Sequence, residues 1–128
     1  MLRRVAHVNL SIDDVEAARS FYGELLGLRP TARPSDAGRP GCWFALGEVE
    51  LHLSLEAGAD NASSKRHVAF EVDDLAAARA RLEAAAVPVE EGRQMTGIQR
   101  FFVRDPAGNR LELYAVLPGD AAGPRDGA

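Results

Sequence analysis

The chain repeats itself at an offset of 60 positions, and this repeat constrains its fold more than any other feature of the sequence. Residues 7–19 and 67–79 share seven identities in thirteen positions, whereas roughly one position in fifteen would match by chance at ordinary composition. The same offset, without a gap, pairs residues 51–53 (Leu-His-Leu) with residues 111–113 (Leu-Glu-Leu). We therefore expect two copies of one structural unit.

The first copy predicts a strand, a helix and three more strands. Apolar and polar residues alternate over Val5–Ile12, which is typical of a half-buried strand. Asp13 or Asp14 can cap the helix that follows, and Gly27 supplies its left-handed stop. A loop rich in proline and glycine spans Pro34–Gly41. The three further strands are expected at Leu28–Arg33, Cys42–Leu46 and Val49–Leu55.

The second copy predicts the same order of elements after a polar connector. Asp105–Asn109, with the sequence Asp-Pro-Ala-Gly-Asn, is a strong turn that should join the last two strands as a hairpin. The connector is expected at Ala57–Lys65, the strand at Arg66–Val72, the helix from Asp74 to about Ala86, and the further strands near Val87, Gln99 and Arg110.

This pattern predicts an α+β fold of two tandem βαβββ modules. Each module is expected to form a curved mixed sheet with one helix outside, which leaves the polar faces of the strands to line a metal and substrate cavity inside. The modules span about residues 5–56 and 66–116 of a single domain, 1–116. Residues 117–128 lack a core-forming pattern and are expected to form a flexible tail.

Composition narrows the classes of partner. The formal net charge is −4, and the arginines are scattered among carboxylates, which disfavours nucleic acid. No apolar stretch is long enough to span a membrane, and the start of the chain lacks the apolar core of a signal peptide. The single cysteine excludes an internal disulfide and fits a reducing cytoplasm. A small-molecule substrate is therefore the expected partner.

Four residues are candidate ligands of a divalent metal ion. His7, His52, His67 and Glu112 fall on the non-leucine faces of equivalent strands, two in each copy, and they include every histidine of the chain. Neutral imidazole nitrogens with one carboxylate oxygen suit zinc, nickel, cobalt, manganese or ferrous iron. Glu50 shares the face of His52 and is the alternative fourth ligand. The repeat, which equates Leu-His-Leu with Leu-Glu-Leu, favours His52.

The middle strands carry candidate pocket residues, although the sequence leaves open which alternate set faces inward. Core packing of the aromatic residues and solvation of the arginines explain each of them equally well. These candidates are Trp43, Phe44, Arg100, Phe101, Phe102 and Arg104, and Asn9 on the first strand is a further candidate pocket residue.

Several motifs together resemble the vicinal oxygen chelate superfamily, which includes glyoxalase I, fosfomycin-resistance transferases, bleomycin-binding proteins and extradiol dioxygenases. The resemblance covers about residues 5–116 and is specific for the fold rather than the reaction. Its motifs are His7-Val8-Asn9-Leu10 before Asp13-Asp14, Phe21-Tyr22, Leu26-Gly27-Leu28, residues 67–74 (HVAFEVDD) and residues 102–113 (FVRDPAGNRLEL).

The resemblance implies that the first and fourth strands of each module supply the metal ligands, which again selects His7, His52, His67 and Glu112. Glyoxalase I usually has a glutamate at the place of His52, so the glyoxalase reaction itself is not implied. The set His7, His67 and Glu112 resembles the triad of extradiol dioxygenases and the ligands of fosfomycin-resistance transferases. The cationic phosphonate-binding pattern of those transferases finds no match. Metal-free bleomycin-binding relatives lack these ligands.

The leading hypothesis is a glyoxalase-like lyase or isomerase. In it a divalent ion chelates neighbouring oxygens of a small substrate and stabilises an enediolate or oxyanion, with Glu112 as the candidate proton carrier. The alternatives are an extradiol-type dioxygenase and a non-catalytic small-molecule binding protein. A homodimer is also expected, because each module leaves an open sheet edge, and the resemblance implies that modules from two chains complete each cavity.

Overall fold

The computed structural model describes residues 1–118, which form two compact units. Among the described residues, the first unit contains residues 1–64 together with Asp105–Asn109, and the second contains residues 65–104 and 110–118. The part of the expected tail beyond residue 118 lies outside the described residues. Within residues 1–118 no helix is long and apolar enough to cross a membrane.

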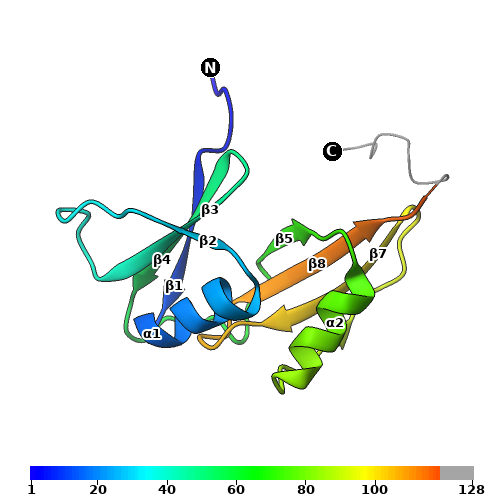
Figure 1. The fold of residues 1–128 in the computed structure, drawn as a ribbon. Helices are drawn as coiled ribbons and strands as arrows, with labels where there is room; N and C mark the ends of the chain where they lie inside the picture. The colour runs from blue at the N-terminus through cyan, green and yellow to red at the C-terminus, as the bar shows by residue number, and fades with distance from the viewer. Residues whose placement is uncertain (119–128) are drawn as a thin grey trace. The chain divides into compact units, whose positions relative to one another are not determined.

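Each unit has the predicted α+β architecture, with a mixed four-stranded sheet and helical structure along one side of it (Figure 1). The strand orders are β1-β4-β3-β2 and β5-β8-β7-β6. In both sheets the first strand pairs in parallel with the fourth, and the other pairs are antiparallel. The elements of the first unit are β1 (His7–Ile12), α1 (Val15–Ala18), the π-helix η1 (Arg19–Leu25), β2 (Arg29–Thr31), β3 (Gly41–Leu46) and β4 (Val49–Leu55), and those of the second are β5 (His67–Glu71), α2 (Leu75–Ala84), β6 (Glu90–Glu91), β7 (Ile98–Arg104) and β8 (Arg110–Val116).

The helix starts follow the predicted caps. The side chain of Asp14 accepts a hydrogen bond from the Ala17 amide at 3.0 Å, and that of Asp74 accepts one from the Ala77 amide at 2.9 Å. These bonds satisfy amides that have no partner within the first helical turn. Gly27 ends the first helical segment at a φ of 77°, as expected for a left-handed stop.

Two details differ from the sequence prediction. The first helix continues as the π-helix η1, in which the Leu26 amide bonds to the carbonyl of Phe21, five residues back. The second strand of the second module is β6 at Glu90–Glu91 rather than near Val87, because the Val87 amide bonds back to the helix at Leu82. The spacing of apolar residues predicts neither feature, because η1 still has its apolar residues on one side and β6 consists of only two charged residues.

The core of each unit lies between the sheet and its helix. In the first unit Tyr22 and Leu53 are fully buried, and in the second Phe101 and Leu111 are. The Tyr22 hydroxyl donates to Asp105 Oδ2 at 2.6 Å, and Asp105 also accepts from the amides of Ala107 and Asn109. The predicted Asp105–Asn109 turn therefore does connect β7 and β8, and buried hydrogen bonds fix its conformation.

Candidate metal and substrate site

In the first unit His52 lies in a stack of three rings on the sheet face opposite the helix. The strand register places Asn9 beside His52 on β1 and Trp43 beside it on β3, so these side chains share one face. The His52 ring is 4.1 Å from that of His7 and 3.7 Å from that of Trp43, with interplanar angles of 16° and 3°. The structure thus brings His7 and His52 together, as the sequence predicted.

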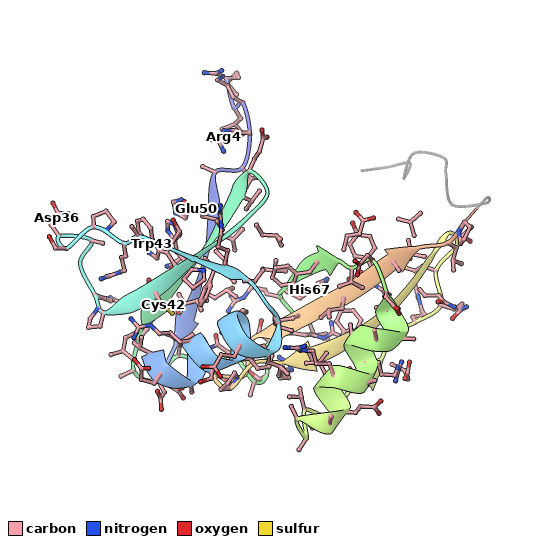
Figure 2. All side chains as sticks on the ribbon, in the orientation of Figure 1. Arg4, Asp36, Cys42, Trp43, Glu50 and His67 are labelled. Atoms are coloured by element: carbon pink, nitrogen blue, oxygen red, sulfur yellow. The ribbon has the colours of Figure 1, made fainter. Side chains whose placement is uncertain are left out.

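Glu50 is a direct partner of His52. Its Oε1 lies 2.9 Å from His52 Nε2, and His52 is 8% exposed. Figure 2 shows Glu50 and Trp43 within the first unit. The register places Glu50 beside His7, so the imidazole nitrogens and this carboxylate lie on the same face. Glu50 and His52 are therefore both candidates for the fourth ligand.

In the second unit His67 and Glu112 form the matching pair. His67 Nε2 is 3.2 Å from Glu112 Oε1, and its Nδ1 lies 3.0 Å from the Lys65 carbonyl. The second contact orients the ring, as expected for a histidine whose other nitrogen binds a ligand. Glu112 is only 4% exposed, and its Oε1 also lies 3.3 Å from Arg100 Nη1. A buried carboxylate is stable here because it has a cationic neighbour.

An aromatic side chain accompanies the fourth-strand residue in each unit. The register places Trp43 beside His52 and Phe102 beside Glu112. Phe102 contacts the His67 ring edge-on at 5.3 Å. The adjacent residues Phe44 and Phe101 point to the opposite, helix-covered faces and are 2% and 0% exposed. The structure therefore shows which of these aromatic side chains face the candidate site. Trp43 and Phe102 lie on the candidate site faces, and Phe44 and Phe101 belong to the core.

The remaining candidates also fall on the site faces. Asn9 accepts a hydrogen bond from Ser54 Oγ at 2.8 Å. Arg104 lies on the same face as Glu112, at the end of β7. The sequence analysis missed Arg110, whose Cζ lies 3.6 Å from the centroid of the Phe102 ring. Its position two residues before Glu112 on one strand was the available signal.

The third strands correspond at an offset of 59 rather than 60. Trp43 faces His52 and Phe102 faces Glu112, although the ligand positions themselves differ by 60. The first unit has its extra residue between the helix cap, Asp14, and the helix stop, Gly27. The equivalent residues of the second unit are Asp74 and Ala86, and the two stops have φ values of 77° and 60°. That stretch contains η1, so the π-helix accommodates the insertion.

Two pockets have linings that include none of the four candidate ligands, although Trp43 and Arg100, which contact His52 and Glu112, line one pocket each. One, of about 520 Å³, lies in the first unit and includes Arg19, Arg33 and Cys42. The other, of about 270 Å³, lies in the second unit and includes Arg79, Met95 and Arg100. Burial raises the pKa of the Cys42 thiol, which makes this thiol a poor nucleophile. Neither pocket identifies a reaction.

The donor types of both pairs suit a divalent transition ion. Imidazole nitrogens and one carboxylate oxygen are its usual protein ligands, and in each unit they lie close together on one face. Within residues 1–118 no three His, Cys, Asp or Glu side chains form a cluster that could hold a metal ion. The structure therefore brings the four candidate ligands together as two pairs, the candidate half-sites His7 with His52 and His67 with Glu112.

Comparison with known proteins finds a matching family and similar proteins. The Glyoxalase/Bleomycin resistance protein/Dioxygenase superfamily matches residues 4–113. The chain is 30% identical to glutathione transferase FosA of Serratia marcescens, over 89% of this chain and 82% of that protein. It is 36% identical to the trivalent organoarsenical cleaving enzyme of Thermomonospora curvata, over 88% and 76% of the two chains.

Solved structures show the same fold. A glyoxalase family protein from Bacillus anthracis has a TM-score of 0.83 at 30% identity, covering 91% of this chain and 98% of that one. The fosfomycin resistance protein FosX of Listeria monocytogenes has a TM-score of 0.80 at 15% identity, covering 97% of this chain and 100% of that one. At this low identity the second comparison supports the fold alone.

Proposed function

The chain belongs to the glyoxalase/bleomycin resistance protein/dioxygenase superfamily, and from this premise we propose that it is a divalent-metal-dependent enzyme of the lyase or isomerase type. Its substrate is a small molecule that presents two neighbouring oxygens to the metal. The observation that carries the proposal is the pairing of donors at equivalent places in both units, His7 with His52 and His67 with Glu112.

In this proposal the two half-sites hold one divalent ion. When bound, the ion supplies Lewis-acid stabilisation of the oxyanion or enediolate that develops on the substrate. His7, His52 and His67 contribute imidazole nitrogens, and Glu112 contributes a carboxylate oxygen. Glu112 is also the candidate proton carrier, because it is the carboxylate among the four candidate ligands. Trp43 and Phe102 flank the fourth-strand residues His52 and Glu112.

One contact favours a second candidate function. Glu50 Oε1 lies 2.9 Å from His52 Nε2. If this contact keeps His52 from binding the metal, the ligands are His7, His67 and Glu112, a set of two histidines and one carboxylate. Such a set is typical of non-haem ferrous oxygenases. The second candidate is therefore a dioxygenase that uses ferrous or manganous ion and a catechol-like substrate.

The named relatives widen the range of substrates to be tested. One is a glutathione transferase and another cleaves trivalent organoarsenicals, so thiol adducts and organoarsenicals belong in a screen with catechols. Retention of the ligand residues disfavours a non-catalytic binding protein. Tight binding of a small molecule by metal-free protein, with no turnover, would support that reading instead.

The first test is metal analysis of protein purified without a histidine tag. Wild-type protein should contain a divalent ion, and His7→Ala, His67→Ala and Glu112→Ala should lose it while remaining folded by circular dichroism. Metal content that stays the same in all three variants would refute the assignment. Activity is then assayed with methylglyoxal–glutathione adduct, fosfomycin with glutathione, catechols in air with ferrous ion, and a trivalent organoarsenical.

A further inference from the structure

Arg110 occupies a position whose charge differs between the two units. At the offset of 60, Arg110 of the second unit corresponds to Glu50 of the first. Each lies beside the first-strand histidine of its own sheet, since the register pairs His7 with Glu50 and His67 with Arg110. The repeat thus places a carboxylate beside one candidate ligand and a guanidinium beside the other.

The guanidinium of Arg110 is held rigidly but is weakly paired. It stacks on Phe102 with Cζ 3.6 Å from the ring centroid, and its side chain is 16% exposed. Within residues 1–118 its charged contact is with Glu90, at 3.5 Å from Nη2, and the Glu90 side chain is 61% exposed. Such an exposed pair contributes little, because solvent screens it.

The donors of Arg110 outnumber their acceptors. A guanidinium carries five N–H donors in one plane, and stacking on an aromatic ring fixes that plane before any ligand arrives. Arg79 provides a contrast in the same unit. It lies over Phe101 on the helix-covered face, but its Nη1 and Nη2 contact the two carboxylate oxygens of Glu91 at 2.6 and 3.0 Å, whereas in the described part of the chain Arg110 has a single contact with Glu90 at 3.5 Å.

We propose that Arg110 binds an oxyanion group of the substrate, a carboxylate or a phosphate-like group, beside the metal ligands His67 and Glu112. This rests on the proposed function in one respect, namely that the anion belongs to the molecule that the metal chelates. Planar guanidinium donors match the two oxygens of such a group, and these charge-assisted hydrogen bonds are the strong ones. The substrate class is therefore a small oxygen chelator that carries an anionic group.

The test measures anion binding by metal-free protein, with benzoate and inorganic phosphate as probes and benzamide as the neutral match of benzoate. Backbone amide NMR signals of His67, Phe102 and Arg110 report occupancy. In wild type at least one of the two anions should shift these signals, and benzamide should not. Arg110→Met should weaken anion binding about 10-fold or more, and Arg79→Met should bind like wild type.

Arg110→Lys keeps the charge but loses the planar donor set, so it should also bind more weakly than wild type. If Arg110→Met does not fold, the binding of anions by Arg110→Lys is the test instead. Equal binding by the Arg110 variants and wild type, equal binding of benzamide and benzoate, or no binding of either anion would overturn the inference. Metal content is measured on each preparation before its metal is removed, so a failure of the proposed metal site is distinguishable from a failure of the anion site.

Discussion

Arg100 Nη1 lies 3.3 Å from Oε1 of Glu112, the same oxygen that faces Nε2 of His67 at 3.2 Å. Arg100 is itself fixed, because its Nε donates to the Arg93 carbonyl at 3.3 Å and its side chain is 17% exposed. Arg100 is therefore placed to orient the candidate ligand Glu112 without itself being a metal ligand. It also places a positive charge beside the buried side chain of Glu112.

We expect Arg100→Met to weaken metal binding by about 10- to 100-fold, the usual loss for a partner of a metal ligand. The orienting effect should outweigh the repulsion that Arg100 exerts on the ion, because without Arg100 the Glu112 side chain loses a contact that fixes its Oε1 beside His67. Competition with a chromophoric chelator measures the affinity. Arg79→Met, on the helix-covered face, is the matched control. Unchanged affinity in Arg100→Met would show that Glu112 needs no such partner.

Trp43 should report metal binding directly. It is the only tryptophan of the chain and stacks on His52 at 3.7 Å, so a change at the imidazole alters its surroundings. Adding metal should change Trp43 fluorescence in wild type, and His52→Ala should abolish the change. If His52→Ala still binds metal as tightly as wild type and Glu50→Gln does not, Glu50 is the fourth ligand instead.

The hydrogen bond between Tyr22 and Asp105 should contribute measurably to stability. It is buried and 2.6 Å long, and removing its donor leaves a buried carboxylate with one partner fewer. Tyr22→Phe should lower the free energy of unfolding by about 1–3 kcal/mol. Urea denaturation of Tyr22→Phe, Asp105→Asn and the double variant forms a cycle. Additive losses would show that the two side chains do not couple.

Tyr22 should also give the protein a dependence on alkaline pH. Burial, together with the carboxylate of Asp105, raises its pKa well above the ordinary value of 10.0. A raised pKa in the folded state means that the stabilising effect is complete below pH 10 and is lost as the pH rises above it. Wild-type stability should therefore fall above pH 10 more steeply than that of Tyr22→Phe. Equal slopes in the two proteins would contradict this.

We also predict a two-fold homodimer in which His7 and His52 of one chain meet His67 and Glu112 of the other. Sedimentation at micromolar concentration tests the dimer. Mixing His7→Ala with Glu112→Ala tests the shared site, because a mixed dimer then holds one intact site and should regain metal. If each chain completes its own site, mixing restores nothing. A monomer in the first experiment would exclude the shared arrangement.

Local signals predicted most of the fold. Alternation located β1, β4 and β8, and Asp14 and Asp74 cap the helices as their positions indicate. The repeat also predicted that His7 would lie with His52, and His67 with Glu112, because equivalent strands of a duplicated unit present equivalent faces. These features depend on residues close in sequence or on the period of two along a strand.

What the sequence could not provide depends on contacts between elements. Phe44 and Phe101 were as plausible in the site as Trp43 and Phe102, because two adjacent aromatic residues carry no signal of which one faces the helix. Arg110 was missed for a related reason. Its role depends on a ring from the neighbouring strand, and no pattern within β8 itself predicts that contact.

The two halves differ by an extra residue in η1 and a compensating extra residue in the turn after β7, which leaves His7 to His52 and His67 to Glu112 at the same separation in the chain. The two halves thus differ in length at two places, while the number of residues between the paired donors is the same in both. A protein engineer who symmetrised the chain by copying one half onto the other would have to transfer both length changes together. Transferring one alone would shift the third strand by one residue and turn its aromatic side chain from the donors to the opposite face.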